Sequence, residues 1–195
     1  MGCIMTKKGL TQKDLEFLKA HTRYDENTIK EWYKGFMKEC PNGRLTRVKF
    51  VDMYQMHYPN KNGEKFCHHV FRTFDTDRNG YIDFKEFLIA IDVTSSGTAE
   101  EKLKWAFRMY DIDGNGVINL DEMTKIIQAI YDMLVGPGVI IPESAEERAK
   151  NIILQLDENG DGQLTEEEFV RGSSGVEPLL DQHGNIQILM IPIFA

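Results

Sequence analysis

Four glycines recur along the chain at nearly regular intervals, and this repeat limits the fold more than any other feature of the sequence. The intervals are 37, 36 and 46 residues, and they separate Gly43, Gly80, Gly116 and Gly162. A repeat of this length indicates one supersecondary unit that is used four times. The sequence therefore predicts units that pack against one another to form a shared core.

Three of the repeats carry the same arrangement of oxygen-bearing residues. Their twelve-residue windows are DTDRNGYIDFKE at 75–86, DIDGNGVINLDE at 111–122 and DENGDGQLTEEE at 157–168. Each fits the pattern Asp-x-Asp/Asn-x-Asp/Asn-Gly-x5-Glu, which is the calcium-binding loop of the EF-hand. Glycine at position 6 permits the sharp turn that lets the chain wrap around an ion.

The predicted ligands occupy the same positions in each window. The ligand shell consists of side-chain oxygens at positions 1, 3 and 5, a backbone carbonyl at position 7, a residue that holds a water at position 9, and a bidentate Glu at position 12. These residues are Asp75, Asp77, Asn79, Tyr81, Asp83 and Glu86; Asp111, Asp113, Asn115, Val117, Asn119 and Glu122; and Asp157, Asn159, Asp161, Gln163, Thr165 and Glu168. Mg²⁺ can fill such a site at rest, but its smaller shell takes one oxygen from the closing Glu, so the sequence favours Ca²⁺ at three sites.

The first repeat, KECPNGRLTRVK at 38–49, keeps the outline of this loop without its ligands. Lys38, Cys40 and Lys49 stand at positions 1, 3 and 12, and Pro41 stiffens the turn. We therefore predict that the first loop binds no ion. A second interpretation, in which Cys40 is a redox switch, stays open. The reactivity of a thiol depends on its pKa, which the sequence does not report.

Apolar residues recur with helical spacing beside every loop, as Ile29, Trp32, Tyr33 and Phe36 do before the first. The predicted fold is all-α, with four EF-hand helix-loop-helix units in two paired lobes. Loop residues at position 8 are expected to form short two-stranded β ribbons between paired loops, with Leu45 beside Ile82 and Ile118 beside Leu164. The first loop is then retained as the packing partner of the second.

The residues around the loops resemble the neuronal calcium sensor family, which includes recoverin, visinin-like proteins, neurocalcin and hippocalcin. The motifs are 32-WYKGF-36, 40-CPNG-43, 69-HVFRTFD-75 and 104-KWAF-107, and the similarity runs from about residue 23 to 172. The resemblance implies an N-terminal lobe at 1–94 and a C-terminal lobe at 98–180, joined by a linker at Thr94–Gly97. The apolar tail at 181–195 does not map onto the family, and we expect a plug or a partner contact there in preference to the alternative, a disordered or atypical end.

The N-terminal residues MGCIMT fit the N-myristoylation pattern, which predicts a myristoyl group on Gly2. Cys3 is either palmitoylated or an unmodified thiol. One myristoyl chain gives a membrane affinity of only about 10⁴ M⁻¹, and Lys7 and Lys8 add attraction to anionic lipid. Since no segment reaches the roughly 20 apolar residues of a membrane span, we expect a cytoplasmic protein that is reversibly at membranes.

Calcium is expected to swing apart the helices of the first two units and to expose a groove for an amphipathic helix of a target protein. The predicted groove residues are Trp32, Phe36, Phe50, Tyr54, Phe74, Phe87 and Leu88. The alternative is that they form a static core. The family resemblance implies that the calcium-free form buries the myristoyl group in this cavity and that calcium ejects it.

Other classes of function fit the sequence less well. A cytosolic calcium buffer would use the same ligands with little helix opening, and it stays the alternative to a sensor. The chain shows no nucleophile–base arrangement, phosphate loop or zinc-ligand spacing, so it is not expected to be an enzyme. A net charge of −8 argues against nucleic acid as a partner. We expect a monomer or weak dimer.

Overall fold

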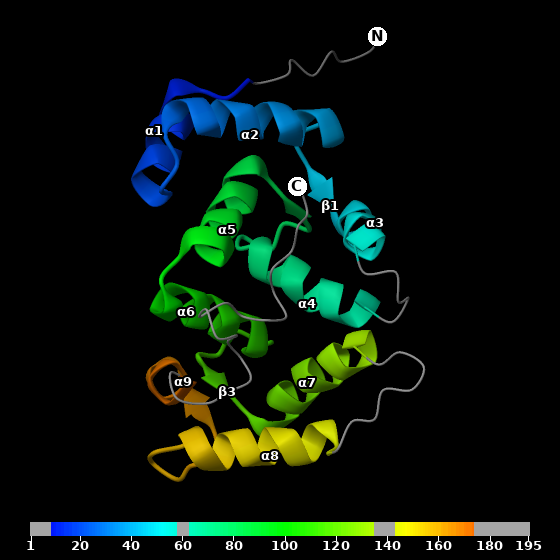
Figure 1. Ribbon diagram of the computed structural model, residues 1–195, viewed down its shortest axis with the longest axis vertical. Helices are drawn as coiled ribbons and strands as arrows, with labels where there is room; N and C mark the ends of the chain where they lie inside the picture. The colour runs from blue at the N-terminus through cyan, green and yellow to red at the C-terminus, as the bar shows by residue number, and fades with distance from the viewer. Residues whose placement is uncertain (1–8, 58–62, 135–142, 174–195) are drawn as a thin grey trace.

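The computed structural model describes residues 9–57, 63–134 and 143–173, which form helix–loop–helix units stacked along the long axis of the molecule (Figure 1). A first helix, α1 (Gln12–His21), precedes them. The units are α2 (Glu26–Glu39), β1 (Leu45–Thr46) and α3 (Arg47–His57); α4 (Glu64–Phe74), β2 (Tyr81–Ile82) and α5 (Phe84–Ser96); α6 (Ala99–Tyr110), β3 (Val117–Ile118) and α7 (Leu120–Leu134); and α8 (Ala145–Leu156), β4 (Leu164–Thr165) and α9 (Glu166–Ser173). The predicted all-α fold is confirmed.

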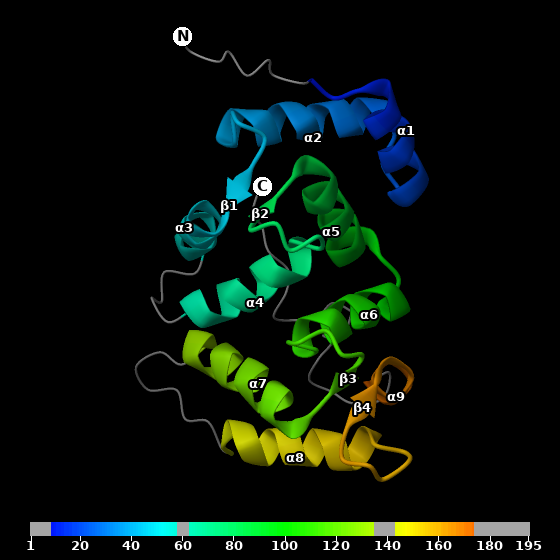
Figure 2. The same cartoon turned by 180° about the vertical axis from the view of Figure 1, so that it is seen from behind.

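Two antiparallel ribbons join the units in pairs, and Figure 2 shows them from the opposite side. Leu45 pairs with Ile82 in the first ribbon, and Ile118 pairs with Leu164 in the second, as the loop register predicts. All four side chains are fully buried. Each ribbon therefore holds one loop against its partner in two ways, by backbone hydrogen bonds and by apolar side chains that are buried in the core.

A single apolar core runs through both lobes. Phe50 packs edge-on against Phe71 with ring centroids 5.7 Å apart, and Phe74 packs at 88° against Trp105 of α6 at 5.9 Å. Such aromatic pairs add about 0.5–1.5 kcal/mol beyond the area that they bury. The second pair crosses from one lobe to the other, so the lobes share part of their core.

The predicted groove residues lie in this core in the described conformation. Phe36, Phe50, Tyr54, Phe74, Phe87 and Leu88 are at most 1% exposed. Trp32 is partly buried and packs against the same core. The static-core interpretation therefore describes this conformation, and the groove stays a prediction about another one.

The connection between the lobes is shorter than the sequence suggests. Thr94 and Ser95 resemble linker residues, yet α5 continues to Ser96. The reason is that their hydroxyl groups donate to carbonyls one turn back, those of Ala90 at 2.8 Å and Ile91 at 2.6 Å. Only Gly97 and Thr98 separate α5 from α6.

Helix α1 is an element that the sequence analysis did not predict. Thr11 and Asp14 form a capping box at its start, and Leu15 and Leu18 are buried. After the helix, Arg23 donates from its backbone N–H and its guanidinium to the buried carboxylate of Asp92 on α5. The same guanidinium binds Glu101 on α6, so this connection touches both lobes.

Several predicted features lie outside the described residues: the acylation segment at Gly2 and Cys3, and the apolar tail at 181–195. Within the described ranges, no helix is both long and apolar enough to cross a bilayer.

The ribbon gives a first testable prediction. Leu45 is fully buried in a loop without calcium ligands, so Leu45→Ala should leave a cavity in the core. This cavity should lower the free energy of unfolding by about 2–4 kcal/mol. Denaturant unfolding measures this change. Val48→Ala is the matched control, because Val48 is 72% exposed and its loss should stay within about 0.5 kcal/mol. Equal stability of the two variants would show that the first unit does not support the second.

Candidate calcium sites

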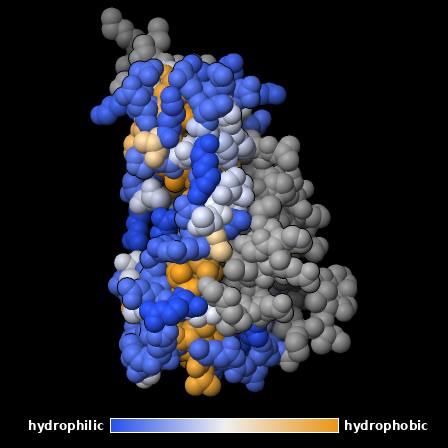
Figure 3. All heavy atoms as spheres, turned by 60° about the vertical axis from the view of Figure 1, so that its left-hand side comes forward, coloured by the Kyte–Doolittle hydropathy of each residue, from blue (hydrophilic) through white to orange (hydrophobic). Residues whose placement is uncertain are grey.

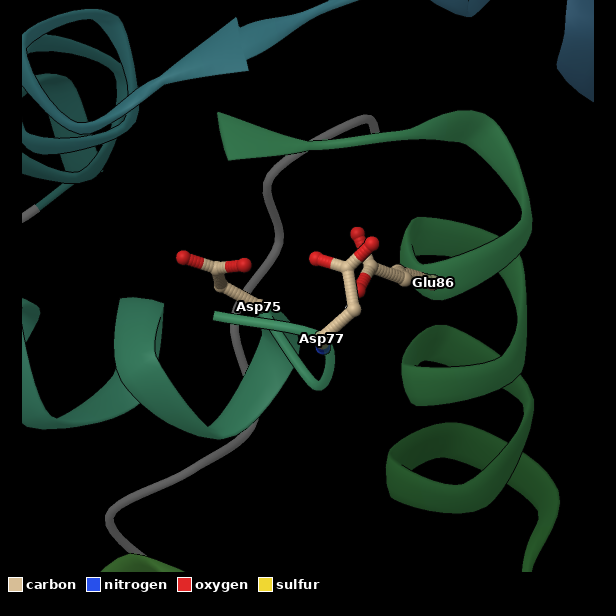
Figure 4. Close-up of side chains that lie close together, drawn as sticks. All are labelled: Asp75, Asp77 and Glu86. Carbon is tan, nitrogen blue, oxygen red and sulfur yellow. The ribbon is translucent and has the colours of Figure 1, made fainter. Parts of the chain in front are cut away.

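Three carboxylates gather in the loop between α4 and α5. The carboxylate oxygens of Asp75, Asp77 and Glu86 lie within 4.8 Å of one another. Asp75 and Asp77 come from the loop itself, Glu86 comes from the first turn of α5, and all three line a common space (Figure 4). Like charges this close repel one another, so the arrangement fits a bound cation.

Backbone N–H groups hold these carboxylates in place. Asp75 accepts hydrogen bonds from the N–H of Gly80 at 2.9 Å and of Asn79 at 3.0 Å. Gly80 has φ of +87°, a conformation that favours glycine. Glu86 accepts a hydrogen bond from the N–H of Thr76 at 2.9 Å, so the closing residue contacts the start of the loop.

The loop between α6 and α7 repeats this geometry. Asp111, Asp113 and Glu122 again place carboxylate oxygens within 4.8 Å of one another. The N–H of Gly116 donates to Asp111 at 3.0 Å, and that of Ile112 donates to Glu122 at 2.9 Å. Because the same sequence positions produce the same contacts, the two loops are equivalent sites.

The loop between α8 and α9 shares the backbone pattern but gathers its charges less closely. The N–H of Gly162 donates to Asp157 at 2.8 Å and lowers the pKa of that carboxyl, as the N–H of Thr165 does for Glu168. Both groups are therefore carboxylates at neutral pH. Among the described residues, the close acidic clusters are confined to the two preceding loops. Here Asn159 takes position 3, where those loops have Asp.

The remaining predicted ligands lie in the same three loops. The side chain at position 5 stabilises the turn by accepting a hydrogen bond from a backbone N–H two residues later. In the second loop, Asn79 accepts from the N–H of Tyr81 at 3.1 Å. Residues at position 7 stand at or next to the strands: Tyr81 in β2, Val117 in β3 and Gln163 just before β4. The corresponding position 5 residues of the later loops are Asn115 and Asp161.

Position 9 has a role that the sequence analysis did not foresee. Asp83, Asn119 and Thr165 accept from the backbone N–H of the closing glutamates, at 3.0, 3.0 and 3.3 Å. These residues therefore cap the outgoing helices as well as lining the loops. The signal was the spacing of a capping box inside the loop pattern, because an Asp, Asn or Thr stands three residues before each closing glutamate.

Comparison with known proteins places this geometry in a family. A family model described as an EF-hand domain pair matches residues 100–174, and one described as an EF hand domain matches residues 66–93. Neuronal calcium sensor 1 of Lymnaea stagnalis is 50% identical over 167 residues, which cover 84% of this chain and 87% of that protein. Recoverin of Homo sapiens is 37% identical over 180 residues, which cover 90% of each chain.

The chain belongs to the neuronal calcium sensor family. The resemblance predicted from its motifs is confirmed, and calcium binding by EF-hand loops is the property that follows from it. S-modulin of Aquarana catesbeiana, 40% identical over 172 residues, is a further similar protein.

In this member of the family, the first loop is closed by a lysine. The Lys49 ammonium donates to the backbone carbonyl of Glu39 and lies 3.4 Å from the carboxylate of the same residue. Gly43 makes the predicted turn with φ of +72°. A fixed cation therefore stands at the position that the other loops give to a glutamate.

Cys40 does not have the environment of a redox switch. It caps α2, it is 2% exposed, and burial raises the pKa of its thiol. Reactive cysteines have the opposite properties, exposure and a lowered pKa. The structure favours a packing role for Cys40.

The first loop also yields a prediction. Lys49→Glu restores the closing carboxylate, yet Lys38 and Cys40 at positions 1 and 3 offer no oxygen ligand. The number of calcium ions bound, measured by titration calorimetry, should therefore equal that of the unchanged chain. One additional ion bound at micromolar calcium would contradict this account of the loop.

Proposed function

We propose that this protein is a calcium sensor that binds Ca²⁺ at its second, third and fourth loops and regulates a membrane-associated target. The observation that carries the proposal is the placement of each closing glutamate. Glu86, Glu122 and Glu168 lie in the first turn of an outgoing helix, and each already contacts the start of its own loop. Ion binding and helix position are linked through these residues.

The mechanism follows from what α5 carries. A bound Ca²⁺ supplies the positive charge that the clustered carboxylates need. Glu86 would then move further toward Asp75 and Asp77, and α5 would move with it. Phe84 and Phe87, on the same helix, pack on Phe36 of α2 at ring distances of 5.6 and 5.3 Å. A shift of α5 therefore has to repack the aromatic core of the first lobe.

We propose that this repacking exposes the apolar residues predicted to form the groove. On the face in Figure 3, hydrophobic surface already reaches the exterior in separate patches between hydrophilic side chains. An opened core would continue this surface and accept the apolar face of an amphipathic target helix. Mg²⁺ would occupy a loop at rest without drawing in both oxygens of the closing glutamate.

We further propose that a myristoyl group on Gly2 anchors the protein reversibly to membranes. The support is the N-terminal sequence pattern together with membership of the family. Co-expression with an N-myristoyltransferase tests it: the intact mass should rise by one myristoyl group in the natural chain and not in Gly2→Ala. An unmodified natural chain would rule out the anchor.

Catalysis is not part of the proposal. Two relatives are named as calcium sensors, which agrees with the expectation that the chain is not an enzyme.

Retention on a hydrophobic resin tests the sensor against the buffer. The natural chain should bind the resin in calcium and elute with chelator, because opening exposes apolar surface. Glu86→Gln, which disables the loop that moves α5, should lose most of this retention. Glu168→Gln is the matched control, because its loop lies in the other lobe. A natural chain that passes through the resin both with and without calcium would identify a buffer.

A further inference from the structure

Arg72, in the last turn of α4, reaches from the second unit into the third. Its Nη2 donates to the carbonyl of Met109 at 2.6 Å, and its Nη1 donates to the carbonyls of Asp111, at 3.0 Å, and Ile112. Asp111 is the first predicted ligand of the third loop. Arg72 itself stands three residues before Asp75, the first predicted ligand of the second loop.

The three carbonyls lie at the end of α6 and the start of its loop, where intrahelical partners run out. The last carbonyls of a helix need donors from elsewhere, and a cation there interacts favourably with the helix dipole. The guanidinium offers several N–H donors in a fixed planar fork, which suits neighbouring carbonyls. Arg72 therefore caps α6 from the other lobe.

The two loops meet at a second point. Arg78, at position 4 of the second loop, has φ of +56°, and its guanidinium lies against Gly114, at position 4 of the third. A Cβ at Gly114 would stand 2.4 Å from Arg78 Nη2. The backbone of one calcium loop thus directly contacts a side chain of the other.

The charge of Arg72 faces the third site. Burial lowers the pKa of Arg72, and the carboxylates of Asp111, Glu122 and Asp113 oppose this change. An arginine nonetheless stays charged in proteins. Its guanidinium therefore holds the first turn of an acidic loop by both hydrogen bonds and charge.

We propose that Arg72 is a positioning residue that couples the second and third calcium loops across the two lobes. This inference rests on the proposed binding at both loops. Closure of the second loop orders the end of α4, and this fixes the guanidinium that shapes the start of the third loop. The ion that binds first orders these contacts, so the second ion binds a protein that is already ordered and loses less conformational entropy. Binding at one loop should therefore strengthen binding at the other, and the effect must be reciprocal.

Calcium titration calorimetry of the full chain tests the coupling. All proteins carry Glu168→Gln, so that only the second and third loops bind. Adding Glu86→Gln, which disables the second loop, should weaken the third loop about fivefold or more when Arg72 is present. With Arg72→Met, the same addition should change the affinity of the third loop less than about twofold.

Two further variants separate positioning from general stability. Arg72→Lys keeps the charge but loses the fork, so the coupling factor should fall between those of the arginine and methionine proteins, and this variant also serves if Arg72→Met does not fold. Arg171→Met is the matched control: Arg171 pairs with Glu158 at 2.9 Å in the fourth loop, which is disabled in every protein of the series, and its coupling should equal that of the natural chain.

The outcomes are distinct. An unchanged coupling factor in Arg72→Met and Arg72→Lys would overturn the proposal while leaving the calcium sites intact. Absence of calcium binding in the Glu168→Gln protein would instead overturn the proposed function.

Discussion

The closing glutamate of each calcium loop is the contact on which the other features depend. It belongs to the outgoing helix, yet its carboxylate accepts hydrogen bonds from the start of the loop that precedes that helix. This contact spans the loop and links the ends of two helices through protein groups alone. The residue that we propose to bind the ion is therefore also placed to set the angle between two helices, and through α5 it reaches the aromatic core.

The first loop shows what the fold requires apart from ligands. It keeps the glycine turn and the buried Leu45 that pairs with Ile82, and it replaces the closing carboxylate with Lys49. The ribbon needs a partner whether or not that partner binds an ion. Loss of ligands at Lys38 and Cys40 was compatible with the fold, whereas loss of the apolar strand residue would leave a cavity.

The sequence predicted the local features well because the loop pattern fixes them. The register of Leu45 against Ile82 follows from spacing alone, and the same spacing brings the carboxylates of Asp75 and Glu86 together in their loop. The features that were missed depend on contacts between distant segments: the packing of α1, the carboxylate of Asp92 that binds Arg23, and the reach of Arg72 to α6. Thr94 and Ser95 suggested a linker by composition, but their hydroxyl groups bond within the helix.

Amide resonances of the four repeated glycines give the most direct test. The N–H groups of Gly80, Gly116 and Gly162 donate to the first Asp of their loops, whereas that of Gly43 donates to the carbonyl of Cys40. An ion bound by those carboxylates would polarise the first three hydrogen bonds. Proton–nitrogen correlation spectra should therefore show large calcium-dependent shifts for Gly80, Gly116 and Gly162 and little change for Gly43. A large shift of Gly43, or unmoved resonances for the other three at saturating calcium, would contradict the account.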